Sequence, residues 1–298
     1  MNRTIRQTVL PVLAALIWGM AFSAQSIAAD YIQPLTFNFY RCVIAFFSLW
    51  VVDLAASKAT PGRKHMLQLN KRQWKRLLLG GGLCGAAIAL GTNLQQLGLA
   101  DTSPGKAGFI TAMYIVIVPV LGLFQKKKVT PLLWTSVAIA VAGLYFLCVT
   151  ESFTVVLSDL YVLICAVMFA VHILIIDYFS TELDGIQMSC IQFLTAGIIA
   201  FVGMLLWEQP SLAAIGQCVI PILYTAVLSS AVGYTLQIIA QKDANPTVVS
   251  LLLSLESVFA AVGGALLLNE QMGPRELLGC GLMMVAVVLA QLPVANRQ

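Results

Sequence analysis

The sequence predicts an all-α integral membrane protein in which ten transmembrane helices form two inverted five-helix repeats. Three observations lead to this fold class: the composition, ten long apolar segments and an internal repeat. Of the 298 residues, 59% are hydrophobic and only 10% are charged, whereas a soluble domain carries roughly 25% charged residues. A surface this poor in charge does not stay in water, so we expect a membrane protein and not a soluble enzyme.

Ten apolar segments are each long enough to cross the ~30 Å hydrocarbon core of a bilayer as an α-helix, which rises about 1.5 Å per residue. Helices are expected because every backbone polar group must find its hydrogen bond inside the segment. The segments span approximately residues 9–29, 34–55, 77–99, 103–124, 131–149, 158–177, 186–207, 218–241, 246–268 and 273–292.

Lysine and arginine in the predicted loops indicate the orientation of the chain, because cytoplasmic loops carry an excess of both. With both termini in the cytoplasm, fourteen of the 17 Lys and Arg residues fall on the cytoplasmic side, and only Lys106 and Arg275 fall outside. Arg41 lies within the second helix. This bias supports the count of ten helices, and it explains the net charge of +4 without a nucleic-acid partner.

Two features of the chain suggest other interpretations. Arg3 and Arg6, an apolar run and small residues imitate a cleavable secretory signal. Cleavage would leave nine helices and spoil the repeat, so we expect this segment to be retained. The seven cysteines are scattered over the predicted helices without CxxC spacing. They indicate small apolar packing residues, and we expect no disulfide framework, no metal site and no cofactor.

An internal repeat divides the chain into halves that we expect at residues 1–150 and 151–298. The ends of the third and eighth helices share four identical positions within eleven residues, at a separation of 142. Upstream, at a separation of 151, Trp18 corresponds to Phe169 and Arg41 to Gln192, and a longer charged loop in the first half accounts for the difference. The identical positions are Leu94, Gln95, Asp101 and Pro104 in the first half and Leu236, Gln237, Asp243 and Pro246 in the second.

Each half contains five helices, and an odd number means that the second half enters the membrane from the opposite side. Inverted repeats of this kind are typical of secondary transporters, whose substrate sites lie near the bilayer midplane at the repeat interface. The repeat therefore predicts a carrier that works by alternating access.

Four stretches, in the expected order, resemble motifs of the EamA family in the drug/metabolite transporter superfamily. They are residues 15–22 (ALIWGMAF) in the first helix, 34–41 (PLTFNFYR) in the second, 102–110 (TSPGKAGFI) with Val118-Pro119 in the fourth, and 254–260 (SLESVFA) with 268–270 (LNE) in and after the ninth. The resemblance covers essentially the whole chain. Ser257 stands where the family usually has a proline, so the sequence leaves open how the ninth helix bends.

The resemblance implies a ten-helix inverted-repeat carrier in the prokaryotic cell inner (plasma) membrane, because members commonly export amino acids, other metabolites or toxic compounds without ATP. A nucleotide-binding G-x-x-x-x-G-K-[ST] motif and an H-E-x-x-H motif are both absent, and we expect no enzymatic activity. Two alternatives stay open: import of the same solutes, and a membrane-embedded enzyme that acts on lipid headgroups. The expected partners are a small-molecule substrate, the lipid bilayer and, for a coupled carrier, protons; the sequence does not indicate the oligomeric state.

Ionisable residues inside predicted helices are candidates for function, because a charge in hydrocarbon costs about 3 kcal/mol or more. Glu256 lies mid-way along the ninth helix, and Arg41 lies about seven residues from the outer end of the second. Glu256 either exchanges a proton during transport, since hydrocarbon favours the neutral carboxyl group, or has a structural role. In that role it forms an ion pair with Arg41 or caps backbone groups of an unwound helix. His172, mid-way along the sixth helix, forms hydrogen bonds within the bundle, contacts the substrate or relays protons.

Polar and aromatic side chains complete the predicted substrate-binding site. Polar residues share one face of the eighth helix and one face of the third, and such faces avoid lipid. Aromatic residues of the first, fourth and sixth helices could form the apolar walls of a cavity. The candidates for substrate contact are Trp18, Phe22, Asn93, Gln96, Tyr114, Phe169, His172, Ser230, Tyr234 and Gln237.

Overall fold

The structure, a computed structural model, describes residues 5–98, 104–125, 127, 129–149, 156–267 and 272–292. Within these ranges every regular element is a helix, and ten helical spans are long and apolar enough to cross a membrane. The predicted fold class is confirmed. The spans are Arg6–Ala29, Pro34–Ala59, Lys71–Gly98, Lys106–Phe124, Pro131–Cys148, Leu157–Phe179, Gly185–Trp207, Val219–Gln241, Pro246–Gly263 and Pro274–Gln291.

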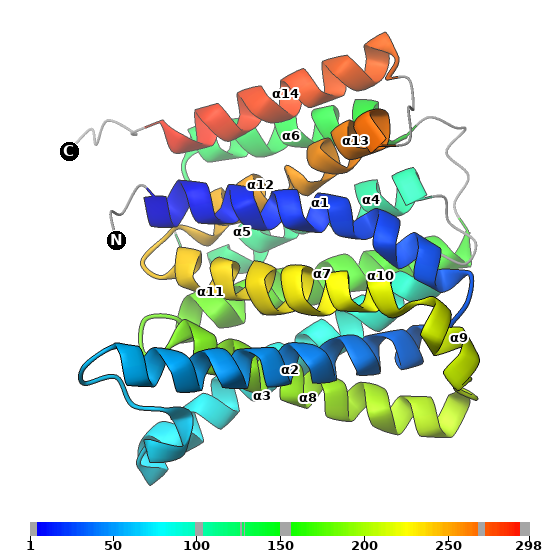
Figure 1. The fold of residues 1–298 in the computed structure, drawn as a ribbon. Coiled ribbons are helices and arrows are strands. Elements are labelled where there is room, and N and C mark those ends of the chain that lie inside the picture. The colour runs from blue at the N-terminus through cyan, green and yellow to red at the C-terminus, as the bar shows by residue number, and fades with distance from the viewer. Residues whose placement is uncertain are drawn as a thin grey trace, which may run out of the picture.

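Some spans are single helices and others are chains of shorter helical elements (Figure 1). The first half contains η1 (Ile5–Val9), α1 (Leu10–Ala29), α2 (Pro34–Ala59), η2 (Met66–Gln68), α3 (Lys71–Gly98), α4 (Pro104–Ala112), α5 (Tyr114–Phe124) and α6 (Pro131–Cys148). The second half contains α7 (Leu157–Phe179), α8 (Gly185–Trp207), α9 (Leu212–Gln217), α10 (Val219–Leu223), η3 (Tyr224–Tyr234), α11 (Thr235–Gln241), α12 (Pro246–Leu253), α13 (Glu256–Leu267) and α14 (Pro274–Gln291).

Local sequence signals set where several helices begin. Proline occupies the first position of α2, α6, α12 and α14. A backbone N–H at this position has no hydrogen-bond partner within the helix, so its absence in proline costs nothing. Side-chain oxygens cap several helices; for example, Thr130 accepts from the amide of Leu133, Asp184 from the first turn of α8, and Asn245 from the amide of Thr247. These caps satisfy amides that the helix itself leaves unbonded.

The predicted limits of the second and third helices were too short at the charged loop. Helix α2 continues to Ala59, past the predicted residue 55, and α3 begins at Lys71, before the predicted residue 77. Asn70 starts α3 because its side chain accepts from the amide of Gln73, whose own side chain accepts from the amide of Asn70. A search for apolar stretches finds the part of a helix that lies in hydrocarbon and misses charged turns beyond it.

Two spans are broken at positions that the repeat relates. The fourth span is interrupted at Met113, between α4 and α5, and the ninth at Ser254–Leu255, between α12 and α13. At each break the backbone tightens to i→i−3 hydrogen bonds, from Met113 N to Ile110 O and from Leu255 N to Leu252 O. Met113 and Leu255 are 142 residues apart, the separation of the repeat. The ninth span therefore breaks without a proline at position 257.

Packing between the halves follows the same symmetry (Figure 1). Helix α2 packs against α8, and α6 packs against α14, so the second and the fifth spans of the two halves pair with each other. Helix α3 packs against α7 and α8, and the eighth span, through η3, packs against α1 and α2. The third span of the first half thus contacts the first two spans of the second half, and the third span of the second half contacts the first two spans of the first half.

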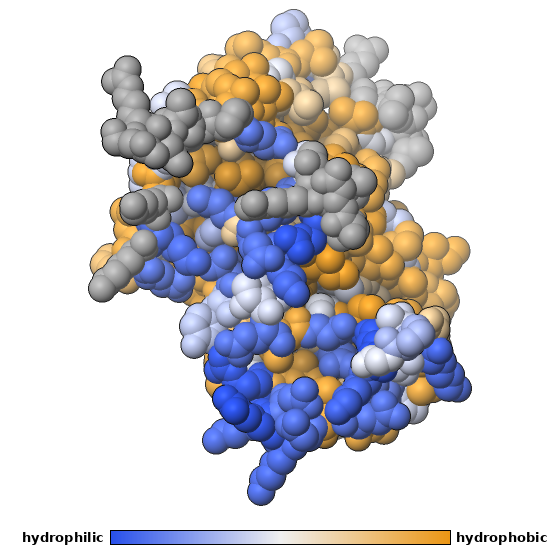
Figure 2. All heavy atoms as spheres, turned by 90° about the vertical axis from the view of Figure 1, so that its left-hand side faces the viewer, coloured by the Kyte–Doolittle hydropathy of each residue, from blue (hydrophilic) through white to orange (hydrophobic). Residues whose placement is uncertain are grey.

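The described ends of the chain lie at one end of the bundle, called here the terminal end. The hydroxyl of Thr8, before α1, donates to the side-chain oxygen of Gln291, the last residue of α14, at 3.0 Å. Viewed from this end, hydrophilic residues gather on the surface, with apolar ones around them (Figure 2). Large apolar side chains such as Leu205 and Leu206 are exposed on the bundle flanks, as expected of a surface that faces lipid.

Glycines on one face of α3 allow the close approach of α8. A Cβ atom added to Gly85 would lie 2.5 Å from the carbonyl oxygen of Gln192 and 2.6 Å from the Cβ of Thr195, whereas one added to Gly82, on the same helix, would meet nothing within 4 Å. The interface between the two halves therefore depends on Gly85 and not on Gly82.

We predict that Gly85→Ala lowers the free energy of unfolding by about 1–3 kcal/mol, because the added methyl group overpacks the α3–α8 contact. The matched variant Gly82→Ala should leave it unchanged or raise it by up to ~1 kcal/mol, since alanine favours the helix. Unfolding of the purified protein in mild detergent, followed by tryptophan fluorescence, measures both. An equal loss of stability in Gly85→Ala and Gly82→Ala would contradict the close contact of Gly85 with α8.

Candidate functional site

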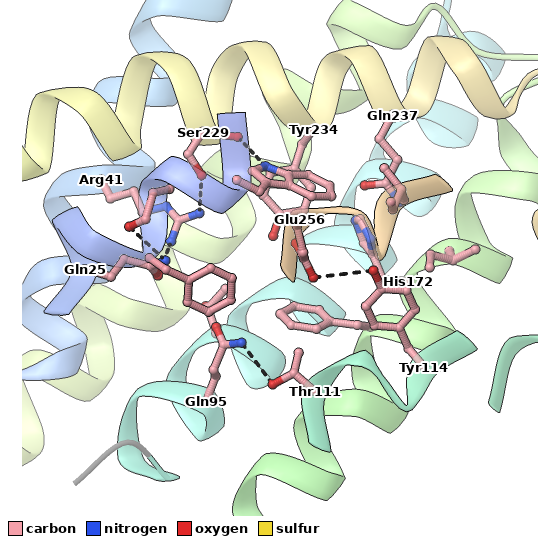
Figure 3. Close-up of a pocket in the computed structure, with 17 residues that line it drawn as sticks. Gln25, Arg41, Gln95, Thr111, Tyr114, His172, Ser229, Tyr234, Gln237 and Glu256 are labelled. Carbon is pink, nitrogen blue, oxygen red and sulfur yellow. Dashed lines mark hydrogen bonds between the residues drawn. The ribbon is translucent and has the colours of Figure 1, made fainter. Parts of the chain in front are cut away.

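A cavity lies between the two halves, around the helix breaks of the fourth and ninth spans. Its walls come from α1, α2, α3, α4, α5, α7, η3, α11, α12 and α13, and Figure 3 shows their side chains gathered around one space. The lining residues are Trp18, Ala21, Phe22, Gln25, Arg41, Thr92, Gln95, Thr111, Tyr114, Phe169, His172, Ile173, Ser229, Tyr234, Gln237, Leu253 and Glu256.

Most of these residues form pairs that the internal repeat relates. At a separation of 151 the pairs are Trp18 with Phe169, Ala21 with His172, and Phe22 with Ile173. At a separation of 142 they are Thr92 with Tyr234, Gln95 with Gln237, Thr111 with Leu253, and Tyr114 with Glu256. Only Gln25, Arg41 and Ser229 line the cavity without their counterparts. The cavity therefore lies on the axis that relates the two repeats.

Tyr114 and Glu256 meet at this axis. Each is the first residue after a helix break, Tyr114 opening α5 and Glu256 opening α13. The Tyr114 hydroxyl donates to Oε1 of Glu256 at 3.4 Å, as the dashed line in Figure 3 shows. Helix α1 comes close to the same break, because a Cβ atom on Gly19 would lie 2.7 Å from the carbonyl oxygen of Glu256. No ion pair between Glu256 and Arg41 occurs among the described side chains.

Arg41 is held by hydroxyl and amide groups. Its Nε donates to Oγ of Ser230 at 2.5 Å, and its two terminal nitrogens donate to Oε1 of Gln25 at 3.3 Å and to Oγ of Ser229 at 3.4 Å. The side chain is only 4% exposed. These neutral acceptors fix the position of the guanidinium group without cancelling its charge, so a positive charge remains in the wall of the cavity.

Buried amide side chains fix several other polar groups. Nε2 of His172 lies 2.7 Å from Oε1 of Gln192, within hydrogen-bond distance. Gln237 donates to Gln241, which in turn donates to the backbone oxygen of Ile173. The side-chain oxygen of Gln237 is buried without a partner among the described groups. Such an acceptor is available to a donor group of a substrate.

Aromatic rings form the middle of the cavity wall. The indole N–H of Trp18 donates to the backbone oxygen of Ser229 at 3.0 Å, and its ring lies 4.6 Å from that of Tyr234, centre to centre. Gly233 makes this contact possible, because a Cβ atom there would lie 2.6 Å from Nε1 of Trp18. The Tyr234 ring also contacts the rings of His172 and Phe193 edge to face. The wall is thus apolar and anchored by hydrogen bonds.

The cavity is narrow, and it extends away from the terminal end. The free space within it is about 60 Å³, which holds only a few water molecules. The paired Gln95 and Gln237 lie near opposite ends of the bundle, Gln237 near the terminal end. Gln25, four residues before the end of α1 and far from the terminal end, lines the cavity, whereas its counterpart Ile176, near the terminal end, does not. An organic solute can therefore enter only when the surrounding side chains move apart.

The profile of the EamA-like transporter family matches residues 8–149 and, a second time, residues 156–292. The chain belongs to this family. The match confirms the family that the sequence motifs indicated, and the chain is accordingly a membrane transporter. The predicted boundary of the halves at 150/151 stays a prediction, since residues 150–155 lie outside the described part of the chain.

Comparison with individual proteins agrees with this assignment. An uncharacterized transporter from Archaeoglobus fulgidus is 28% identical over 295 residues, which cover 95% of this chain and 84% of the relative. A chloroplastic WAT1-related protein from Arabidopsis thaliana is 35% identical over 78 residues, 26% of this chain and 19% of the relative. A protein of known crystal structure superposes with a TM-score of 0.77 over 96% of both chains at 15% identity, which shows a shared fold.

Nine of the predicted site residues of this EamA-family chain line the cavity, namely Trp18, Phe22, Arg41, Tyr114, Phe169, His172, Tyr234, Gln237 and Glu256. Their roles in binding or coupling stay predictions. Asn93, Gln96 and Ser230 are not among the lining residues. Asn93 instead accepts from Asn38 of α2, and Ser230 holds Arg41. Asn93 differs in direction by about 100° from Thr92 on the helix, which turns it from the cavity toward α2.

The prediction from single helix faces missed Gln95, Thr111, Gln25 and Ser229. Gln95 could have been found from the repeat, because it corresponds to Gln237, which was predicted. In the structure Gln95 donates to the hydroxyl of Thr111 at 3.2 Å. The repeat could not have indicated Gln25 and Ser229, because their counterparts do not line the cavity. Both residues accept hydrogen bonds from Arg41.

We predict that Ser230→Ala lowers the free energy of unfolding by about 1.5–3 kcal/mol, because it removes a short hydrogen bond to a buried charge. Ser229→Ala is the matched control on the neighbouring residue, and it should cost less, since its 3.4 Å contact with Arg41 is near the limit of a hydrogen bond. Denaturant unfolding of the purified variants measures the difference. A larger loss for Ser229→Ala would show that Ser230 does not hold Arg41.

Proposed function

We propose that this EamA-family transporter is a secondary carrier that exports amino acids, related metabolites or toxic compounds across the cell inner membrane by alternating access. The observation that supports this most is the cavity of repeat-related residue pairs. Because each half presents the same set of positions to the axis, the two halves can exchange packings and open the site to the opposite side of the membrane.

The orientation that we propose places both termini in the cytoplasm. Lysine and arginine crowd the loops of the terminal end, which makes it the cytoplasmic end by the positive-inside rule. The cavity extends toward the opposite end, so this conformation is the one closer to opening outward. Ion pairs such as Arg6 with Asp243, at 3.3 Å, join spans at the terminal end in this conformation.

The chemistry of the cavity favours zwitterionic or amphipathic solutes. Arg41 supplies a positive charge suited to a carboxylate, and Glu256 supplies carboxyl oxygens that can accept a hydrogen bond from an ammonium group. The half-helices α5 and α13 begin at mid-depth, and their positive ends also favour an anionic group there. Trp18, Phe22 and Phe169 provide apolar contacts for the rest of the molecule.

Glu256 is the group that we propose to couple transport to protons. It is 9% exposed and contacts Tyr114, a neutral partner, and no basic side chain of the described structure pairs with it. A buried carboxyl group without a cation is stable when protonated and costly when charged. Its proton can therefore be released when the site opens to water and regained before the site closes.

Export and coupling are tested together in proteoliposomes, with solutes chosen by a growth screen for compounds that cells expressing the protein tolerate. We expect net solute flux that responds to an imposed pH gradient. Glu256→Gln should abolish that response while exchange of internal for external solute continues, because the neutral amide imitates only the protonated state. Asp30→Asn, at an exposed carboxylate after α1, should retain it.

Two results would contradict the proposal. Lipid turnover without solute flux would make the protein an enzyme, and an unchanged response to pH in Glu256→Gln would move the coupling to another group. Solute accumulation in everted vesicles identifies export, and accumulation in right-side-out vesicles identifies import.

Alternating access makes a further prediction about residues that are buried now. The counterparts of Gln25, Arg41 and Ser229 are Ile176, Gln192 and Ala87, all at most 2% exposed. When the halves exchange packings, these positions should line the cavity on the cytoplasmic side.

We predict that Ala87→Cys reacts several-fold faster with a membrane-impermeant maleimide applied from the cytoplasmic side when transported solute is present. Ala89→Cys is the matched control, because it is equally buried on the same helix and its counterpart, Ala231, does not line the cavity. Labelling is measured by mass spectrometry as the added mass of the maleimide, and the protein without the introduced cysteine gives the background. Equal labelling of the two positions would contradict exchange between the repeats.

A further inference from the structure

A second pocket lies at the terminal end, outside the cavity described above. The loop between α2 and α3, the first two turns of α3 and the turn between α7 and α8 form its walls. Four cationic side chains line it, Arg63, Lys64, Arg72 and Arg76. We call it the basic pocket. Both repeats contribute to it, α3 from the first and the start of α8 from the second.

The basic pocket carries more positive than negative charge. Arg63 is paired with Asp53 at 2.8 Å and with Asp184 at 2.9 Å, and Arg76 is paired with Glu182 at 2.8 Å. No ion pair of the described residues involves Lys64 or Arg72. The four cations and the three carboxylates leave a net charge of +1, and Lys64 and Arg72, which form no ion pair within the described residues, favour an anionic ligand.

A buried network fixes the loop that carries these cations. Asp53 is fully buried, and its carboxylate accepts from the amide of Met66 at 2.9 Å and from the side chain of Gln187 at 3.1 Å, besides the pair with Arg63. Gln187 also donates to the backbone oxygen of Lys64 at 2.8 Å. The backbone at Lys64 is thus tied to α8, and the pocket is formed before a ligand arrives.

The length of α3 places the pocket at the level of lipid headgroups. Its 28 residues correspond to about 42 Å at ~1.5 Å per residue, which exceeds the ~30 Å hydrocarbon core. The first turns of α3 therefore extend beyond the hydrocarbon at the terminal end. Leu69, Leu77 and Leu183 line the same pocket, so its apolar part suits the glycerol and upper acyl region of a lipid better than a free ion.

The opposite end of the bundle has no comparable site in the corresponding loop. There a pocket lies beside α9, between α8 and η3, the connection that corresponds to the α2–α3 loop in the repeat. Its lining residues, Tyr31, Ile32, Gln33, Thr36, Trp207, Gln209, Pro210, Ser211 and Ala214, include no charged side chain. The cations are therefore a property of one membrane face, and anionic lipids are characteristic of the cytoplasmic face.

We propose that the basic pocket binds the phosphodiester headgroup of an anionic phospholipid, with Lys64 and Arg72 as the contacts to the phosphate. This site is independent of the solute that the carrier transports. A lipid bound there contacts both repeats at once, because the pocket joins α3 to the α7–α8 turn.

The test is binding of phosphatidylglycerol to the purified full-length protein, measured by native mass spectrometry or by thermal stabilisation. We expect phosphatidylglycerol to bind more tightly than phosphatidylcholine, with an affinity that falls as salt rises. Lys64→Gln and Arg72→Gln should each weaken it about fivefold, as expected for one basic residue near an anionic surface. Lys75→Gln is the matched control, since Lys75 lies on the same turn of α3 and does not line the pocket.

Three results would overturn the proposal. An equal loss with Lys75→Gln would indicate general surface charge, and equal binding of phosphatidylcholine would show that the anionic headgroup is not recognised. Competition by inorganic phosphate at millimolar concentration would identify a soluble anion as the ligand. A loss of about fivefold in each of Lys64→Gln and Arg72→Gln, with unchanged thermal stability in the absence of lipid, supports the site. Folding of both variants is checked by their elution as single species in detergent.

Discussion

Lipid hydrocarbon offers no hydrogen-bonding partner, and this constraint decides where a membrane-spanning helix can be interrupted. A break leaves backbone groups without their usual helical partners, so it is tolerated only inside the protein or against an aqueous space. The breaks at Met113 and Ser254–Leu255 both lie at the interface of the two halves. Each repeat hides its irregular backbone against the other, and the cavity arises where the two breaks meet.

The same constraint explains how Arg41 is accommodated. A buried guanidinium group needs its donors satisfied, and two serines of η3 and Gln25 of α1 supply the acceptors. Those serines lie on an 11-residue π-helix, a rare element that occurs frequently at functional sites. The wider turns of η3 present Ser229 and Ser230 next to each other to one arginine. The positive charge is thus retained and not neutralised by a neighbouring carboxylate.

The fold could be predicted from the sequence because bilayer thickness and backbone chemistry leave few choices. Ten apolar segments, the distribution of lysine and arginine and the match of residues 94–104 with 236–246 were sufficient. The ends of helices in charged regions were less predictable, since Lys71–Arg76 form helix without being apolar. Their helical state depends on the cap at Asn70, which hydropathy does not detect.

The site was predictable only in part. A helical pattern shows which residues share one side of a helix, but it does not show whether that side faces the cavity or another helix. The third helix was assigned a polar face of Thr92, Asn93 and Gln96, whereas only Thr92 of these lines the cavity, together with Gln95. Comparison of the repeats would have corrected this, as Tyr234 and Gln237 occupy the corresponding positions. Gln25 and Ser229 could not be found in this way, since they depend on the asymmetric placement of Arg41.

The contact between Tyr114 and Glu256 has a consequence for how the duplicated halves can diverge. Residues that correspond in an inverted repeat and lie on its axis must touch each other, so each is the neighbour of its own copy. If both halves had a glutamate at this position, two carboxyl groups would meet there, and like charges at such a distance cannot both ionise. A phenol opposite a carboxyl group avoids this conflict. The two corresponding positions thus differ in chemistry, one supplying a hydrogen-bond donor and the other an acid.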